Sequence, residues 1–182
     1  MFIDITLAVT PQILQQVQAG HRSAYSGHVG THFDVMDKTF PLEYTRRSGL
    51  FFDVSGIRDR DIQVTDISME AVGEGMFVGF YTGFLEEAGY GTAAYFKDHP
   101  QLSEELVHAL VRKQISIIGV DCAGIRRGKE HTPADQYCAD HGVFVVENLC
   151  HLSSVLGACI VNTYPMNYVG WSGLPCRVIV EK

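Results

Sequence analysis

A short stretch near the beginning of the chain, residues 27–35, constrains the fold and the function more than any other part of the sequence. His28, His32 and Asp34 share one face only if this stretch is extended, because side chains alternate between the two faces of a strand. In a helix, Asp34 would point about 120° away from the histidines. The opposite face of the strand then carries residues that pack against a core, Val29, Thr31, Phe33 and Val35.

Two neutral imidazoles and one carboxylate are a ligand set that suits zinc, manganese or ferrous iron and leaves coordination positions open. Gly30 places no side chain between the imidazoles, so an ion and a water can approach the backbone closely. The pattern therefore predicts a catalytic metal site. The alternative is that His28 and His32 are ordinary surface or hydrogen-bonded core residues, since two histidines four apart are a weak motif.

The length of 182 residues and the hydrophobic content of 46% predict a single domain, residues 1–182, with a sizeable core. The charged fraction of 19% is below the usual quarter, which suggests that partner subunits cover part of the surface. A net charge of −7 argues against a nucleic-acid or anionic-membrane partner, and no apolar run is long enough to span a bilayer. Five widely spaced cysteines without a C-x-x-C pair indicate reduced thiols and a cytoplasmic protein.

The hydrophobic pattern predicts strands that alternate with few helices. Expected strands, besides the one at 28–35, cover residues 2–7, 50–55, 76–82, 115–120, 143–146 and 177–180. An amphipathic helix is expected over 103–113 with Ser103 as its N-cap, and a second helix over 133–139. Residues 83–100, with one helical turn, and 161–173 are expected to be irregular. The continuous apolar runs are typical of strands covered on both faces in a layered α/β protein.

Two acidic residues directly follow apolar strands, Asp121 and Glu147. Burying a charged Glu147 is costly unless it meets a cation or a metal. The alternative is that Glu147 is at the start of the next helix, near its positive end. Asp121 lies where ligand-facing residues of α/β sheets gather, but an Asp in such a position is also a common turn residue.

The pattern His28-x-Gly30-Thr31-His32-x-Asp34 resembles the H-x-G-T-H-x-D signature of the cyclase family, which includes bacterial kynurenine formamidases (arylformamidases) and isatin hydrolases. Further stretches resemble family landmarks and occur in family order: Phe52-Asp53-Val54-Ser55, Tyr81-Thr82-Gly83, Gly119-Val120-Asp121, Val146-Glu147-Asn148-Leu149 and Leu174-Pro175-Cys176-Arg177. The resemblance therefore extends over essentially the full chain.

This resemblance implies an α/β fold of the layered β/β/α swivelling-domain type, with a mixed sheet or barrel-like core and few helices. It also implies a zinc or manganese site and hydrolysis of the C–N bond of a small amide, cyclic or N-formylated, by metal-activated water. The matching metal ligands are His28, His32 and Asp34, with Glu147 close to a second ion. Similar proteins form assemblies, so a homodimer or homotetramer is expected.

Two departures from the family pattern bear on the second metal position. The family signature continues D-x-P-x-H, whereas this chain has Met36 at the proline position and Lys38 at the final histidine position. The position twelve before the family's Glu is usually His, and here it is Asp135. Losing both histidines argues against the two-zinc form, so we expect a single metal, or a second position altered by Asp135.

These departures leave open which residue transfers protons. Lys38 could replace the missing histidine if burial and a nearby cation lowered its pKa, although it could equally be a solvated loop lysine. Glu147 and His141 are the other catalytic candidates, with His131 as an alternative proton carrier; His141 could instead simply end a helix. Two other functions also remain open: a metal- or ligand-binding homologue without catalysis, and a metal-dependent dehydratase or cyclising enzyme.

Overall fold

A mixed sheet of eight strands organises the part of the chain that the computed structural model describes, residues 1–20 and 26–182. The strands are β1 (Phe2–Asp4), β2 (His32–Asp34), β3 (Arg46–Asp53), β4 (Phe77–Tyr81), β5 (Ile117–Val120), β6 (Phe144–Glu147), β7 (Gly157–Pro165) and β8 (Gly173–Glu181). Their order is β1-β8-β2-β6-β5-β4-β3-β7, and β7 also pairs with β8. Seven strands thus close into a barrel, with β1 added outside on β8.

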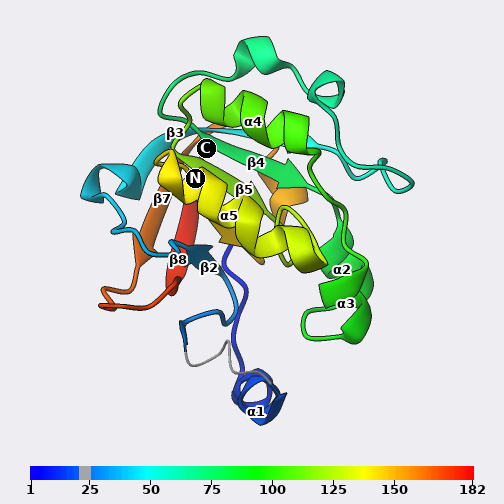
Figure 1. The fold of residues 1–182 in the computed structure, drawn as a ribbon, viewed down its shortest axis with the longest axis vertical. Coiled ribbons are helices and arrows are strands. Elements are labelled where there is room, and N and C mark those ends of the chain that lie inside the picture. Colours follow the sequence, from blue (N-terminus) through cyan, green and yellow to red (C-terminus); the bar gives the residue numbers. More distant parts are fainter. Residues whose placement is uncertain (21–25) are drawn as a thin grey trace.

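Helices cover one side of this barrel. Those in the described residues are α1 (Pro11–Gly20), α2 (Phe84–Ala88), α3 (Ala93–Lys97), α4 (Glu104–Arg112) and α5 (His131–Asp140). Figure 1 shows α4 and α5 side by side across the parallel strands β4 and β5, whereas α1 lies apart from the barrel. The predicted N-cap of α4 is confirmed, because the Ser103 side chain accepts a hydrogen bond from the Leu106 amide. No helix among the described residues has the length and apolar character needed to cross a membrane.

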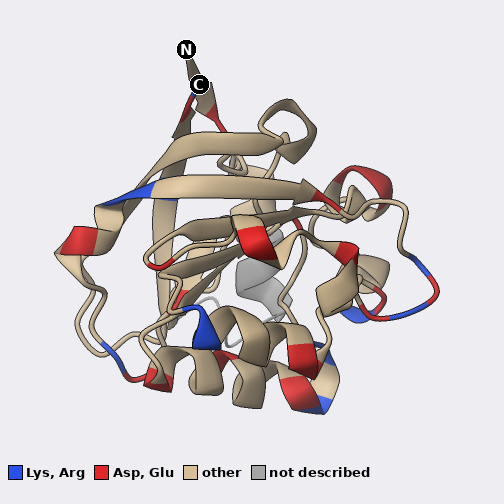
Figure 2. Ribbon diagram, turned by 90° about the horizontal axis from the view of Figure 1, so that it is seen from above, with Lys and Arg blue, Asp and Glu red and all other residues tan. Residues whose placement is uncertain are grey.

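Alternating side chains of the strands fill two separate cores. In β6, Phe144 and Val146 point into the barrel with Phe33 and Phe77, whereas Val145 packs outward with the apolar face of α4. The central strands are therefore covered on both faces, as their continuous apolar sequences predict. Figure 2 agrees, because most charged positions lie on helices and loops and the strands are mostly uncharged. The layered α/β fold with a barrel-like core and few helices is confirmed.

The expected strand over 28–35 is largely wrong. Only His32–Asp34 is extended, and Gly30 has a left-handed φ of +61° that turns the chain just before β2. Residues 83–100 contain more helix than the single expected turn, because they form the two short helices α2 and α3.

Three further expectations need correction. The segment 161–173 is less irregular than expected, because β7 continues to Pro165 by pairing with β8. The second helix begins at His131 rather than at residue 133. Glu147 ends β6 and does not begin a helix.

Candidate metal centre

The pairing of β2 with β6 creates the centre of the site. These strands run antiparallel with His32 opposite Glu147. Phe33 and Val146 point into the barrel, so His32, Asp34 and Glu147 all project from its outer surface. His32 Nε2 lies 3.7 Å from Asp34 Oδ1 and 3.7 Å from Glu147 Oε2.

Helix α5 and the turn before β2 supply the remaining side chains. His131 and Asp135 are four residues apart and therefore share one face of α5. His131 Nε2 lies 3.2 Å from Asp135 Oδ2 and 3.5 Å from Glu147 Oε1. His28 Nδ1 lies 2.9 Å from Asp34 Oδ1, although His28 does not belong to the strand. Two overlapping groups result, each with potential ligand atoms within 4.8 Å of one another: His28, His32 and Asp34, and Asp34, His131, Asp135 and Glu147.

The two groups of candidate ligands contain most of the unpaired buried polar atoms of the described residues. Among the described residues, only six buried side-chain nitrogen or oxygen atoms lack a hydrogen-bond partner. Four of them belong to the cluster: His32 Nε2, Asp34 Oδ2, Asp135 Oδ1 and Glu147 Oε1. Leaving such atoms unpaired costs about 1–3 kcal/mol each, and more for charged groups. The donor set therefore fits divalent cations, because each of the four atoms belongs to a residue of one of the two ligand groups and a cation would satisfy the unpaired atoms of its group.

The electrostatics of the cluster support the same interpretation. Burial raises the pKa of Glu147 and of Asp135 well above their ordinary values, and the nearby Asp34 raises both further. Burial opposes ionisation of Asp34 as well, but His32 and His28 outweigh it and lower the pKa of Asp34 to about 2. Burial also lowers the pKa of His32. Without an ion, the site thus favours a neutral His32 and protonated Asp135 and Glu147 beside an ionised Asp34, and a cation would allow Asp135 and Glu147 to ionise as well.

The orientation of His32 is suited to metal binding. Its Nδ1 lies 2.8 Å from the Gly30 carbonyl oxygen, which can only accept a hydrogen bond. The proton therefore lies on Nδ1, and Nε2 presents its lone pair to the carboxylates. A carbonyl or carboxylate behind the second ring nitrogen is the usual arrangement for a metal-ligating histidine.

Two of the three predicted catalytic residues lie outside the cluster. Lys38 Nζ forms ion pairs with Asp140 Oδ1 at 2.7 Å and with Asp37 Oδ1 at 3.0 Å. Hydrogen bonds to these two carboxylates raise the pKa of Lys38, whereas a role in proton transfer required a lowered one. His141 is exposed, and its Nδ1 contacts the Tyr137 carbonyl oxygen at 2.7 Å. Neither residue belongs to either group of ligand atoms.

The other predicted site residues are brought together: His28, His32, Asp34, Asp135 and Glu147. The sequence suggested His131 only as a proton carrier, yet it lies inside the second group. Asp135 is at the position where the family has a histidine, and His131 lies one helical turn before it. The i, i+4 spacing of His131 and Asp135 was the signal that could have identified His131 as a candidate ligand. Asp121 is a turn anchor instead, because it accepts hydrogen bonds from the Thr82 amide and hydroxyl and the Gly83 amide.

A cavity of about 430 Å³ opens beside the cluster. Its wall contains site residues together with aromatic and small side chains, namely Ser26, His28, His32, Tyr90, Phe96, Ala123, His131, Thr132, Glu147 and Asn148. This volume is within the range that accommodates small organic ligands.

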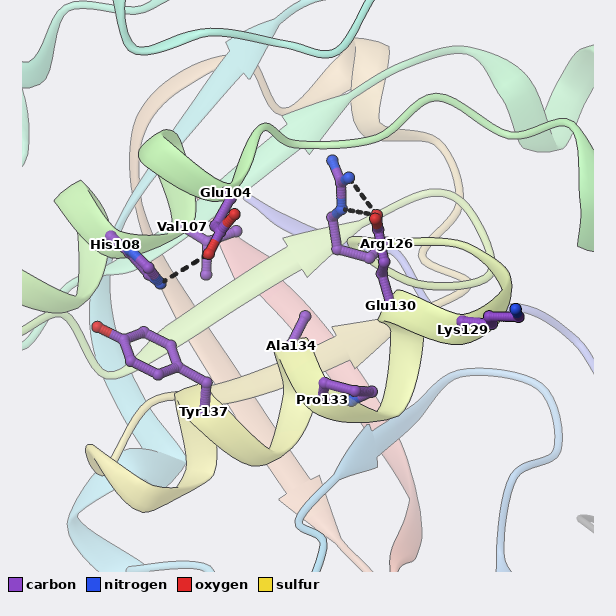
Figure 3. Close-up of a pocket in the computed structure, with 9 residues that line it drawn as sticks. All are labelled: Glu104, Val107, His108, Arg126, Lys129, Glu130, Pro133, Ala134 and Tyr137. Atoms are coloured by element: carbon purple, nitrogen blue, oxygen red, sulfur yellow. Dashed lines mark hydrogen bonds and ion pairs between the residues drawn. The ribbon is translucent and has the colours of Figure 1, made fainter.

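A second cavity, of about 290 Å³, lies on the opposite side of α5, between that helix and α4 (Figure 3). Ion pairs join its charged lining residues, Arg126 with Glu130 and His108 with Glu104. None of its lining residues carries one of the unpaired buried atoms found in the described chain. We therefore assign the functional site to the cavity beside the metal cluster.

The comparisons with known proteins agree with the resemblance seen in the sequence. The family model Cyclase, described as "Putative cyclase", matches residues 3–126. The chain belongs to the cyclase family of enzymes. The matched segment ends before His131, Asp135 and Glu147, so it contains only the first group of ligands. No curated protein matches the chain.

Solved structures show the same fold over nearly the whole chain. One, described as a "potential metal-dependent hydrolase with cyclase activity", is 22% identical with a TM-score of 0.73, covering 99% of this chain and 96% of that chain. A "predicted metal-dependent hydrolase" from Bacillus stearothermophilus is 22% identical with a TM-score of 0.75, covering 99% and 97%. Isatin hydrolase A from Labrenzia aggregata, bound to benzyl benzoate, is 17% identical with a TM-score of 0.77, covering 99% and 93%.

Proposed function

We propose that this protein is a metal-dependent hydrolase that cleaves the C–N bond of a small amide, cyclic or N-formylated. The observation that carries the proposal is the presence of four unpaired buried atoms, from His32, Asp34, Asp135 and Glu147, in two overlapping groups of candidate ligands beside a cavity. Buried acids kept at such a cost to stability are typical of a functional site rather than of a core.

His28, His32 and Asp34 would hold a first divalent ion, for which zinc and manganese are the candidates. Asp34, His131, Asp135 and Glu147 would form the altered second position. Three carboxylates and one imidazole favour a harder ion there than at the first position. A bound divalent ion would polarise the amide carbonyl and lower the pKa of water toward neutrality.

The chain's own groups would move the proton. Burial raises the pKa of Glu147, so Glu147 can hold a proton when no ion occupies the second position. His131 is one-third exposed beside the cavity, and its Nε2 faces Glu147 Oε1 at 3.5 Å. His131 Nδ1 lies 3.2 Å from the Arg126 carbonyl oxygen, which fixes the ring. We therefore assign proton delivery to the leaving nitrogen to Glu147 and His131 rather than to Lys38 or His141.

The shape of the cavity supports a small organic substrate. Tyr90 and Phe96 contribute aromatic surface to the wall of the cavity, and Ala123 contributes a small side chain. A solved neighbour described as an isatin hydrolase bound to thioisatinate, 19% identical over 85% of this chain, is consistent with a cyclic amide as substrate.

The experiment is a hydrolysis panel of N-formyl anilides and cyclic imides, with and without added zinc or manganese, in water enriched in oxygen-18. We expect metal-dependent turnover with one heavy oxygen atom in the acid product, and no turnover by His32→Ala. Turnover without label from water would support a dehydratase or cyclising enzyme. Bound metal without turnover of any amide would support a binding protein, and either outcome would overturn hydrolysis.

We also propose that the chain forms a homodimer or homotetramer. The loop between β7 and β8 and its flanks expose large apolar side chains, Tyr164, Met166, Tyr168, Val169 and Trp171. Contiguous exposed apolar surface of this kind is typical of interaction sites. Light scattering coupled to size-exclusion chromatography tests this, with Val169→Asp expected to weaken assembly. The five cysteines are all unpaired, which supports a reducing, cytoplasmic location.

A further inference from the structure

A chain of buried hydrogen bonds begins behind the ring of His32 and ends at Tyr95. The Gly30 carbonyl oxygen accepts from His32 Nδ1 at 2.8 Å and from Asn148 Nδ2 at 2.9 Å. The Asn148 Oδ1 accepts in turn from the Tyr95 hydroxyl at 2.6 Å. His32, Tyr95 and Asn148 are each at most 3% exposed, so water does not replace these bonds.

The Gly30 peptide is held in an unusual conformation. Its φ of +61° is left-handed, and a Cβ at this position would lie 2.4 Å from Val9 Cγ2. The Gly30 amide donates to the Tyr90 hydroxyl oxygen at 2.9 Å, so the residue is bound through both its amide and its carbonyl. The Gly30 carbonyl oxygen, which accepts the hydrogen bond from His32 Nδ1, is therefore fixed before any metal binds.

The Tyr95 hydroxyl determines which way the Asn148 amide points. If the amide were flipped, its oxygen would face the Gly30 carbonyl oxygen across 2.9 Å, and the two acceptors would repel each other. Burial raises the pKa of Tyr95 well above its ordinary value, so its hydroxyl stays protonated and donates to Asn148 Oδ1. The orientation with Nδ2 toward Gly30 satisfies both the Gly30 carbonyl and the Tyr95 hydroxyl.

The backbone of Asn148 explains how two consecutive residues serve one site. Its φ of +58° is left-handed, which Asn tolerates better than most residues, and it interrupts the strand alternation directly after Glu147. Glu147 and Asn148 consequently both line the cavity. The Thr31 hydroxyl donates to the Asn148 carbonyl oxygen at 2.7 Å and ties this turn to the segment that carries His32.

We propose that Asn148 and Tyr95 are positioning residues that hold His32 in the Nδ1-protonated tautomer required of a metal ligand. The inference rests on the proposed function, because it takes His32 to be a ligand. Neither Asn148 nor Tyr95 belongs to the groups of ligand atoms, and Tyr95 does not line the cavity. Groups that orient a ligating histidine typically change metal affinity 10–100-fold when they are removed.

The test compares zinc affinity, measured by competition with a chelator, in Tyr95→Phe, Asn148→Gly and the control Tyr44→Phe. Asn148→Gly keeps the left-handed backbone while removing the amide. Tyr44→Phe also loses one hydroxyl hydrogen bond, to the Gly142 carbonyl oxygen, but outside the site. We expect Tyr95→Phe to weaken zinc binding about tenfold, Asn148→Gly at least as much, and Tyr44→Phe less than twofold. Nitrogen-15 NMR of His32, with zinc and after its removal, reports the tautomer directly.

In wild type we expect the His32 proton on Nδ1 in both states, and in metal-free Tyr95→Phe a mixture of tautomers. Unchanged zinc affinity in folded Tyr95→Phe and Asn148→Gly would overturn the inference, as would a wild-type proton on Nε2 in the metal-free protein. If wild type binds no zinc or other divalent ion, the proposed function fails first. Binding by wild type with unaffected variants would refute only the positioning role.

Discussion

Replacing Glu147 with Gln should stabilise the metal-free protein while weakening metal binding. Glu147 is buried near Asp34 and Asp135, with candidate ligand atoms within 4.8 Å of one another. Two charged carboxylates at that separation repel by about 3 kcal/mol at an effective dielectric constant near 20. Protonating a glutamic acid of ordinary pKa 4.5 at pH 7 also costs about 3 kcal/mol. A glutamine side chain in place of Glu147 would avoid both costs, and its amide would donate to the unpaired carboxylate oxygens.

The direction of the pH dependence follows from the raised pKa of Glu147. Below pH 4.5 the acid is protonated in the folded and unfolded states alike, so Glu147 carries no penalty there. As the pH rises toward the raised pKa of the folded state, the unfolded state loses its proton first and wild type is destabilised. The advantage of Glu147→Gln should therefore be near zero below pH 4.5 and reach about 1–3 kcal/mol at pH 7.

The assay is urea denaturation of chelator-treated protein at pH 4.5 and pH 7, repeated at pH 7 with saturating zinc. With saturating zinc, wild type should become more stable than Glu147→Gln, because wild type binds zinc more tightly and therefore gains more stability from binding. Asp121→Asn is the matched control, since Asp121 is a buried acid whose oxygens accept hydrogen bonds from Thr82 and Gly83. It should lose about 1–3 kcal/mol. If Glu147→Gln lost stability at pH 7 as Asp121→Asn does, Glu147 would be a structural acid and the reasoning would be refuted.

The remaining predictions concern single residues. Lys38→Ala should leave kcat/KM within about twofold of wild type, because Lys38 forms an ion pair outside the cluster and exposed ion pairs contribute little to stability. A larger loss of kcat/KM in steady-state kinetics would show that Lys38 takes part in catalysis. His131→Asn should lower the amount of divalent ion bound per chain and reduce kcat by more than tenfold, checked by metal analysis and kinetics, and unchanged values in both would contradict its role. Gly30→Ala should cost about 1–2 kcal/mol in denaturant titrations, since it forces a left-handed backbone and a clash with Val9; wild-type stability would contradict the assigned backbone geometry.

Much of this site was predictable from two features of the sequence: the alternation of side chains along strands, and an acidic residue directly after an apolar strand. Glu147 ends a run of apolar residues in which neighbours alternate between the barrel interior and the outer core, so its burial on the outer side follows from the pattern. His28 does lie beside His32 and Asp34, but not for the reason that the pattern gave. His28 reaches Asp34 from a turn, and not from the same strand.

The positions of Lys38 and His131 depend on tertiary structure that the local pattern does not contain. After β2 the chain turns through Met36, at a φ of +55°, and Lys38 pairs with Asp140 at the carboxyl-terminal end of α5. His131 reaches the cluster because α5 begins two residues earlier than its sequence suggested. Similarly, the Asn148 side chain forms hydrogen bonds with Tyr95 and Gly30, which are distant in sequence.

The most direct test of the metal centre is the divalent-metal content of the purified protein, measured by mass spectrometry for wild type and His32→Ala. His32 Nε2 is one of the four unpaired buried atoms of the cluster, so the loss of this imidazole should remove most of the bound zinc or manganese. We expect at least one ion per wild-type chain and a clear deficit in the variant. Wild-type protein that stays free of divalent ions after exposure to zinc and manganese, or equal metal content in both proteins, would contradict the account.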